Sequence, residues 1–259
     1  MKIRIITAII ALIIFLPFII LGKEYFLFAT VVLSLLANYE VVKIVFGKLN
    51  LIILILLDLI SMLVFFKDSI IDKYFIIIIF MALIVMLLLS IVVSEHKIKV
   101  GDISVIVFMS VYIAIGFYSL YMLRIQGLDV ILYLLITIWV TDSGAYFGGM
   151  NFGKRKLSPN ISPNKSIEGS LIGALSSLVV AVGFFFTTDI FKDIILAIVV
   201  TLVVSILGQT GDLIESAFKR EYNVKDSSNI LPGHGGIFDR FDSVILTTPM
   251  LLSILLLIN

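Results

Sequence analysis

The stretch Gly211–Ser243 reads GDLIESAFKREYNVKDSSNILPGHGGIFDRFDS and lies between two apolar runs. It holds six acidic residues, four basic residues and a histidine, in a chain that is 61% hydrophobic. If its first part is helical, Asp212, Ser216 and Lys219 stand at i, i+4 and i+7 and share one face, with Glu215 beside them. An acid, a hydroxyl and a base on one face can bind a metal and a phosphate together. The stretch therefore predicts a polar site inside an otherwise apolar protein.

A turn is predicted at Leu231–Gly236, because a proline and three glycines within six residues disfavour both helix and strand. Bare glycine backbone lets N–H groups approach phosphate oxygens closely. After the turn, Asp239 and Asp242 stand at i and i+3 and lead into the last apolar run. Together with Asp212 they make three carboxylates that would repel one another at a shared site unless cations balance them.

The composition places the chain in the membrane. Of its 259 residues 61% are hydrophobic and 14% are charged, and the mean hydropathy is +1.20. Ordinary soluble domains have roughly 45–50% apolar and about 25% charged residues. The chain has no cysteine and two histidines, so thiolate sites are excluded and a zinc site is disfavoured. A metal would have to be held mainly by oxygen, which favours Mg²⁺, and the carboxylate count allows a second cation such as K⁺.

Nine apolar runs approach the roughly 20 residues with which a helix crosses a bilayer, the third and the last being short. They lie at about Ile5–Leu21, Tyr25–Phe46, Leu51–Phe66, Tyr74–Ser94, Ile103–Leu123, Leu128–Phe147, Ser170–Phe186, Ile194–Gly211 and Ser243–Ile258. The first is longer than a signal-peptide core and has no cleavage pattern, so we interpret it as a retained span. The sequence thus predicts one all-α, polytopic integral-membrane domain over 1–259. It would comprise a five-helix region at 1–127 and a catalytic region at 128–259 with polar loops at 148–169 and 212–242.

The basic residues predict the orientation of these spans. With the N-terminus in the cytoplasm, 14 of the 19 basic residues fall on the cytoplasmic side and 5 on the other. The positive-inside rule favours this arrangement. Because two spans separate the loops 148–169 and 212–242, both would face the cytoplasm, where a soluble nucleotide could reach them.

The polar stretch resembles the signature of the phosphatidate cytidylyltransferases, also called CDP-diacylglycerol synthases. The residues that match are Ser216, Lys219, Arg220, Lys225, Asp226, Leu231, Pro232, Gly233, His234, Gly235, Gly236, Asp239, Arg240 and Asp242. Two further segments resemble that family, and their matching residues are Asp142, Ser143, Ala145, Tyr146, Ser162, Pro163, Lys165, Ser166, Glu168 and Gly169. So long a spaced pattern is far more specific than a lone glycine-rich loop. The resemblance covers mainly residues 139 to 243.

The resemblance implies that the substrates are CTP and phosphatidate and that the products are CDP-diacylglycerol and pyrophosphate. It also implies a multi-pass enzyme of the cell membrane, working on membrane lipid, and a homodimer. We expect no nucleic-acid partner.

Roles for individual residues follow from combining the resemblance with the chemistry of each side chain. We expect Asp212, Asp239 and Asp242 to hold metal, and Ser216 to donate a hydrogen bond to a phosphate. The remaining expected substrate contacts are those of Lys165, Lys219, Arg220, Arg240, Asp142, His234, Gly235 and Gly236. For His234, a general base competes with a donor to phosphate or a brace for the turn. Since a phosphomonoester is already largely dianionic at neutral pH, the first of these roles is not required.

Two other functions fit parts of the pattern. A CTP-dependent lipid kinase would use similar substrates but transfer the γ-phosphoryl group, and composition and spacing do not separate it from a cytidylyltransferase. An ion-coupled transporter would use Glu40, Asp58 and Asp142 as coupling acids. The transporter is disfavoured because the acids cluster at one membrane face and no repeat is visible. For Glu40 we favour a role in helix packing.

Overall fold

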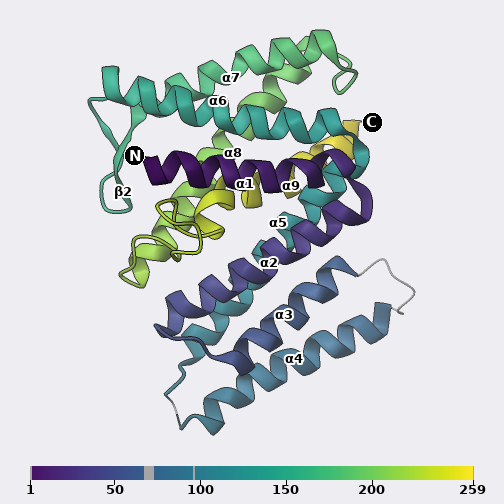
Figure 1. Cartoon of the computed structure of the whole chain (residues 1–259), viewed down its shortest axis with the longest axis vertical. Helices are drawn as coiled ribbons and strands as arrows, with labels where there is room; N and C mark the ends of the chain where they lie inside the picture. The colour runs from purple at the N-terminus through teal and green to yellow at the C-terminus, as the bar shows by residue number, and fades with distance from the viewer. Residues whose placement is uncertain (1, 67–72, 96, 259) are drawn as a thin grey trace.

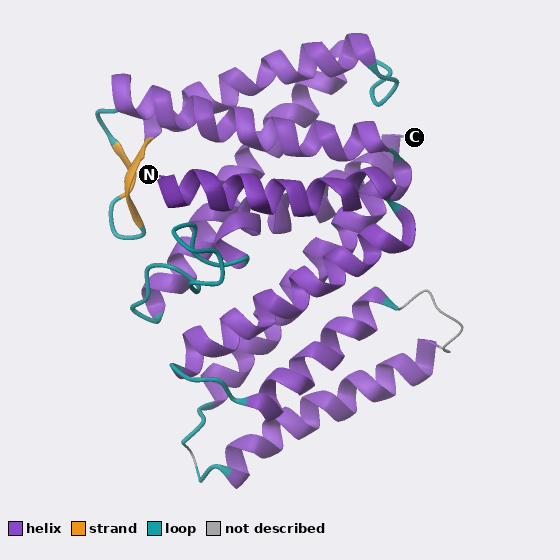
Figure 2. Cartoon of the chain, in the orientation of Figure 1, coloured by secondary structure: helices purple, strands orange, loops and turns teal. Residues whose placement is uncertain are grey.

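A computed structural model of the chain describes residues 2–66, 73–95 and 97–258, and for residues 2–6, 8, 9, 12 and 73–75 it describes the backbone alone. Within these ranges the chain forms nine helices and one two-stranded hairpin (Figures 1 and 2). The helices are α1 (Lys2–Leu21), α2 (Lys23–Phe46), α3 (Leu51–Phe65), α4 (Lys73–Val93), α5 (Val100–Gln126), α6 (Leu128–Phe152), α7 (Ile167–Thr187), α8 (Ile194–Glu221) and α9 (Phe238–Ile258). The antiparallel strands are β1 (Lys156–Ser158) and β2 (Ser162–Ser166).

The prediction of an all-α polytopic membrane protein is confirmed. Each predicted apolar run corresponds to one helix, and seven of the described helices are long and apolar enough to cross a membrane: α2, α4, α5, α6, α7, α8 and α9. Helix α3 is shorter, at 15 residues. The last helix is longer than its apolar run, because it begins at Phe238 and so reaches 21 residues.

The predicted edges of the polar loops were wrong, because helices continue beyond the apolar runs. Helix α6 runs to Phe152, and Ser166 caps the start of α7 by accepting a hydrogen bond from the Gly169 N–H (3.1 Å), so only residues 153–166 lie outside helices. Likewise α8 runs to Glu221, where basic residues in the last turn complement the helix dipole. Polar side chains that face an aqueous end of the bundle do not interrupt a helix.

Glycines let the helices of the C-terminal half approach closely. A Cβ added to Gly173 of α7 would lie 2.6 Å from the Thr141 carbonyl oxygen of α6, and one added to Gly144 would lie 2.5 Å from Ser176 Oγ. Small residues at such a contact are typical of helix pairs in membranes. In the same way a Cβ on Gly211 of α8 would lie 2.6 Å from the Asp242 carbonyl oxygen of α9. Helices α8 and α9 therefore meet where the polar stretch begins and ends.

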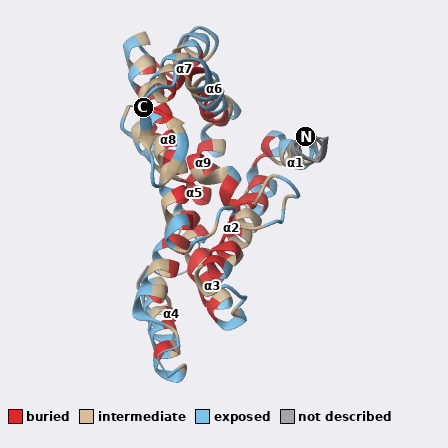
Figure 3. Cartoon of the chain, turned by 90° about the vertical axis from the view of Figure 1, so that its left-hand side faces the viewer, coloured by how far each residue is buried: buried red, intermediate tan, exposed pale blue. Residues whose placement is uncertain are grey.

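The core runs along the middle of the bundle. The buried share is largest on α5 and α2, whereas α4 at the edge is largely exposed (Figure 3). The N-terminus, the hairpin and the 222–237 segment lie at one end of the molecule, and the C-terminus lies at the other (Figure 1). The two predicted polar loops therefore share one end of the bundle, which we call the loop end.

Candidate functional site

The last turns of α8 present the acids, the hydroxyl and the base that the spacing predicted. Ser216 Oγ donates to Asp212 Oδ1 at 3.3 Å, so these two side chains do share a face. Lys219 turns elsewhere and pairs with Glu215, four residues before it, at 2.5 Å. The helical face thus divides into two groups of side chains, one around Asp212 and one around Lys219.

The first group, which we call the open cluster, consists of Asp142, Lys165, Asp212 and Asp242. The hairpin delivers Lys165, whose Nζ lies 2.6 Å from Asp212 Oδ2, and the two side chains remain 29% and 34% exposed. Helices α6 and α9 add Asp142 and Asp242, and these two acids and Asp212 lie close enough together to repel one another electrostatically. Three carboxylates face a single lysine, so the cluster carries excess negative charge at the loop end.

The second group, which we call the closed cluster, consists of Glu215, Lys219, Ser227 and Asp239. Lys219 Nζ lies 2.6 Å from Asp239 Oδ1, and the exposures of Glu215, Lys219 and Asp239 are only 2%, 8% and 9%. The other oxygen, Asp239 Oδ2, accepts from the Ser227 N–H (2.9 Å), Ser227 Oγ (2.9 Å) and the Gly236 N–H (2.7 Å). Both oxygens of Asp239 are therefore already bonded within the protein.

The predicted turn at Leu231–Gly236 is confirmed. Leu231 and Gly235 pair as an isolated bridge, the His234 N–H donates to the Leu231 carbonyl (2.8 Å), and Gly233 and Gly235 have φ of 78° and 81°. Only glycine adopts such φ values without strain, which explains their place here. The Gly236 N–H is donated to Asp239, so in this arrangement it is not available to a phosphate. His234 itself is half-buried in the turn.

Glu40 also belongs to the site, although the sequence analysis did not place it there. This acid lies on α2, is fully buried, and accepts hydrogen bonds from Ser227, Ser228, Ile237 and Phe238. The expected helix-packing role describes only part of these contacts, because one partner of Glu40 lies at the start of α9 and the other three belong to the 222–237 segment. The available signal was an ionisable residue inside an apolar run, which is costly unless it is bonded.

Comparison with known proteins shows the family of the chain. The model of the cytidylyltransferase family matches residues 2–258, which is nearly the whole chain. The chain belongs to the cytidylyltransferase family. A phosphatidate cytidylyltransferase of Staphylococcus haemolyticus is 41% identical over 265 residues, covering 97% of each chain. Proteins of the same name from Staphylococcus aureus strain COL and Staphylococcus epidermidis strain ATCC 35984 are 38% and 40% identical, again over 97% of each chain.

The family motifs in the hairpin serve to present Lys165. Glu168 accepts from the N–H groups of Lys154 (3.0 Å) and Arg155 (3.1 Å), and from Arg155 Nε (2.9 Å), which closes the base of the hairpin. Lys154, Arg155 and Lys156 are exposed. Because β2 leads straight into α7, this closure holds Lys165 beside Asp212.

The remaining predicted phosphate ligands lie at the loop end without joining either cluster. Arg220 is exposed and its Nη1 donates to the Val224 carbonyl oxygen at 2.8 Å. Arg240 is exposed on the first turns of α9. Both guanidinium groups are therefore accessible to a ligand from solution.

The metal predicted from the sequence stays a prediction. In the described part of the chain, no three Asp, Glu or His side chains converge closely enough to form a ready-made metal cage. Mg²⁺ does not need such a cage, since it is usually bound by one or two carboxylates together with water and substrate phosphates. The excess negative charge of the open cluster fits that mode of binding.

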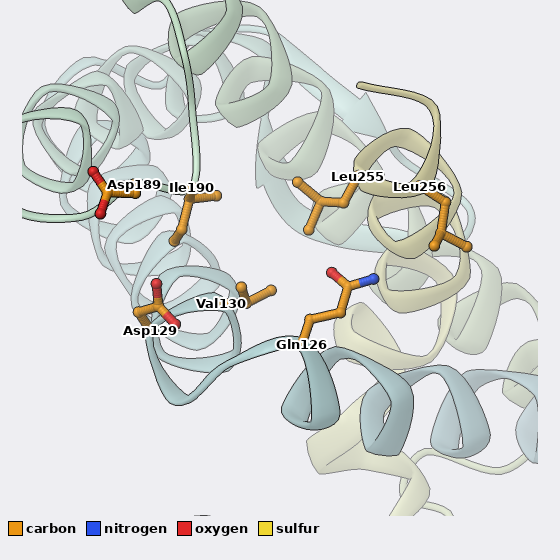
Figure 4. Close-up of a pocket in the computed structure, with 7 residues that line it drawn as sticks. All are labelled: Gln126, Asp129, Val130, Asp189, Ile190, Leu255 and Leu256. Atoms are coloured by element: carbon orange, nitrogen blue, oxygen red, sulfur yellow. The ribbon is translucent and has the colours of Figure 1, made fainter. Parts of the chain in front are cut away.

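A hollow of about 400 Å³ lies away from all of the predicted site residues. It is lined by Gln126, Asp129, Val130, Asp189, Ile190, Leu255 and Leu256 (Figure 4). These residues belong to the α5–α6 and α7–α8 connections and the end of α9, at the end of the bundle opposite the loop end (Figure 1). Its volume alone does not make it the site of the chemistry, because none of the family motifs reach it.

Proposed function

We propose that this chain transfers the CMP moiety of CTP to phosphatidate, forming CDP-diacylglycerol and releasing pyrophosphate. Its nearly full-length similarity to proteins named phosphatidate cytidylyltransferases supports this reaction. The observation that carries the proposal at the level of residues is the contact between Lys165 and Asp212 at 2.6 Å. Two motifs almost fifty residues apart thereby form one polar site at one end of an apolar bundle.

The reaction needs positioning and charge stabilisation more than proton transfer. A phosphatidate oxygen attacks the α-phosphorus of CTP, a new P–O bond forms, and the bond to the bridging oxygen of pyrophosphate breaks. The phosphomonoester is already largely dianionic at neutral pH, because its second pKa is about 6. A general base is therefore not required, and His234 is proposed as a brace of the turn or a donor to phosphate.

Asp212 and Asp242 are the proposed metal ligands, with Asp142 beside them. A bound Mg²⁺ would neutralise charge on the triphosphate and stabilise the departing pyrophosphate. Asp239 was the third ligand expected from the sequence, but we leave it out of the proposed set, because Lys219 would have to leave its Oδ1 before a metal could bind there. A second cation such as K⁺ also stays a prediction that the number of acids permits.

The bases have two proposed roles. Lys165, Arg220 and Arg240 bind phosphate oxygens, and Lys165 exchanges Asp212 for the substrate when the nucleotide enters. Lys219 is buried between Glu215 and Asp239, and its contacts with both acids hold their side chains in place. Ser216 donates to Asp212 and so fixes the direction of that carboxylate.

The site is proposed to face the cytoplasm from a cell membrane, with a homodimer as a further prediction of the resemblance. The 14 to 5 division of basic residues and the cytosolic source of CTP support this orientation. Because the chain has no native cysteine, this orientation can be tested with single cysteine substitutions at exposed positions. Cysteines at Asn160 and Asn229 should react with a membrane-impermeant maleimide from the cytoplasmic side, and one at Asp193 from the other side. If Asn160→Cys and Asn229→Cys react from opposite sides, the hairpin and the 222–237 segment cannot form one site.

The position of a radioactive label tests the reaction itself. Purified protein is given phosphatidate or diacylglycerol with Mg²⁺ and CTP labelled at either the α- or the γ-phosphate. We expect the α-label in the lipid product with phosphatidate, and the γ-label in pyrophosphate. Transfer of the γ-label to diacylglycerol, with CDP as the second product, would establish the kinase instead.

A further inference from the structure

Glu40 lies far from the catalytic motifs in sequence but makes its contacts among them. It stands in the apolar helix α2, and its carboxylate is fully buried. Oε2 accepts from Ser227 Oγ (2.9 Å) and the Phe238 N–H (2.8 Å), and Oε1 accepts from Ser228 Oγ (2.6 Å) and the Ile237 N–H (2.9 Å). All four donors come from residues 227–238.

Two of these donors are the backbone N–H groups at the start of α9. The first N–H groups of a helix have no partner within the helix, and a negative charge placed there is favourable. Ile237 and Phe238 supply such groups, and Glu40 caps them from a different helix. The carboxylate therefore fixes where α9 begins and in which direction its first turns point.

Those first turns carry the acids of both clusters. Asp239 belongs to the closed cluster and Asp242 to the open cluster, one and four residues after Phe238. Ser227 Oγ lies 2.9 Å from a carboxylate oxygen of both Glu40 and Asp239, and its single hydrogen is shared between these two acceptors, so the hydroxyl links the anchor to the closed cluster. A displacement of Glu40 would reach the substrate site through either route.

The motif glycine Gly236 has a place in the same arrangement. A Cβ at this position would collide with Ser227 Oγ and with Glu40 Oε1. The backbone passes so close to the carboxylate that a side chain here would displace Ser227 or Glu40. Gly236 and Glu40 thus depend on each other, because the close approach of the backbone to the carboxylate requires a glycine.

We propose that Glu40 is a positioning residue for nucleotidyl transfer: its buried carboxylate anchors the 227–238 segment and the start of α9, so that Asp242 stays opposite Asp212. The proposal rests on the proposed function for its catalytic meaning. The anchoring itself can be measured without turnover.

Glu40→Gln tests the anchor with the smallest change of shape. Whichever way the amide turns, its NH₂ group faces one backbone N–H and one hydroxyl, so one N–H at the start of α9 loses its acceptor. We expect faster hydrogen–deuterium exchange in peptides covering 227–238, with unchanged exchange in the hairpin at 153–166. We also expect kcat to fall by roughly 10–100-fold with a smaller change in KM for CTP.

Asp58→Asn is the matched control, because it makes the same carboxylate-to-amide change on the neighbouring helix α3. Asp58 accepts from Asn38 Nδ2 at 3.0 Å and contacts neither cluster. An asparagine can keep that acceptor, so exchange at 227–238 and kcat should match the wild type. If Glu40→Gln behaves like this control in both measurements, Glu40 does not position the site.

A milder variant decides the matter if Glu40→Gln exchanges faster in every peptide, which would indicate general unfolding. Ser228→Ala removes one of the four hydrogen bonds at a half-buried position. A local rise in exchange at 227–238, in a chain otherwise protected as in the wild type, supports the anchor, and an unchanged segment overturns it. If the wild-type protein makes no CDP-diacylglycerol, the proposed function is wrong. The anchoring role of Glu40 is still tested, because hydrogen–deuterium exchange is measured without turnover.

Discussion

The open and closed clusters both take residues from helices α8 and α9, yet they differ in what remains available to a ligand. Helix α8 gives Asp212 to the open cluster and Lys219 to the closed one, while α9 gives Asp242 and Asp239 in the same way. In the closed cluster both oxygens of Asp239 are occupied by protein donors. In the open cluster one half-exposed lysine faces three acids. The comparison teaches that an acid is available to a ligand only when few protein donors already bond its oxygens. Its place in a motif does not decide this.

The largest expected effect is loss of turnover in the open cluster. Asp212→Asn and Asp242→Asn keep the shape of the side chain and remove its charge, so each should lower kcat by about 10³-fold or more if it holds a metal on the transferring group. The protein should still express and fold, because these acids lie at the aqueous loop end. The measurement is the initial rate as a function of Mg²⁺ and CTP concentration. Near wild-type rates with unchanged Mg²⁺ dependence would show that these acids are structural.

A substitution in the closed cluster should mainly lower the folding stability of the protein. Asp239→Asn removes the charge that faces Lys219 in a buried pair, and breaking such a pair costs of the order of 3 kcal/mol. Asp212→Asn breaks a half-exposed pair and should cost about 0–1 kcal/mol. The fraction of protein that stays folded after heating in detergent compares the two variants. Equal losses of stability would erase the distinction between the clusters.

Part of this arrangement could be predicted from the sequence and part could not. The apolar runs located the nine helices of the described residues, and the spaced motif identified the family, because both signals are local in sequence. The start of α9 at Phe238 was missed because the residues before Ser243 are polar, and its cap is Glu40, nearly two hundred residues earlier. The sequence also could not predict that Asp239 and Asp242 have different hydrogen-bond partners. Their i, i+3 spacing is the same whether donors surround one acid or both.

A smaller effect is expected for the base of the open cluster. Lys165→Met removes a positive charge that we propose exchanges from Asp212 to a substrate phosphate, so kcat/KM for CTP should fall by about 10²-fold. Lys156→Met is the matched control, because it removes an exposed lysine from the same hairpin. Its kcat/KM should stay within about twofold of the wild type, since a surface charge of this kind contributes little. If the two variants lose activity equally, the hairpin acts through its general charge and not through Lys165.

The central claim is that the open cluster, and not the closed one, receives the metal with the nucleotide. Binding of Mn²⁺, a paramagnetic substitute for Mg²⁺, can be counted by electron paramagnetic resonance in the presence of CTP and without turnover. We predict that Asp212→Asn and Asp242→Asn weaken this binding by at least about tenfold, whereas Asp239→Asn, in protein that remains folded, changes it by less than about threefold. Loss of Mn²⁺ binding in Asp239→Asn as large as in Asp212→Asn, with binding retained in Asp242→Asn, would contradict the account.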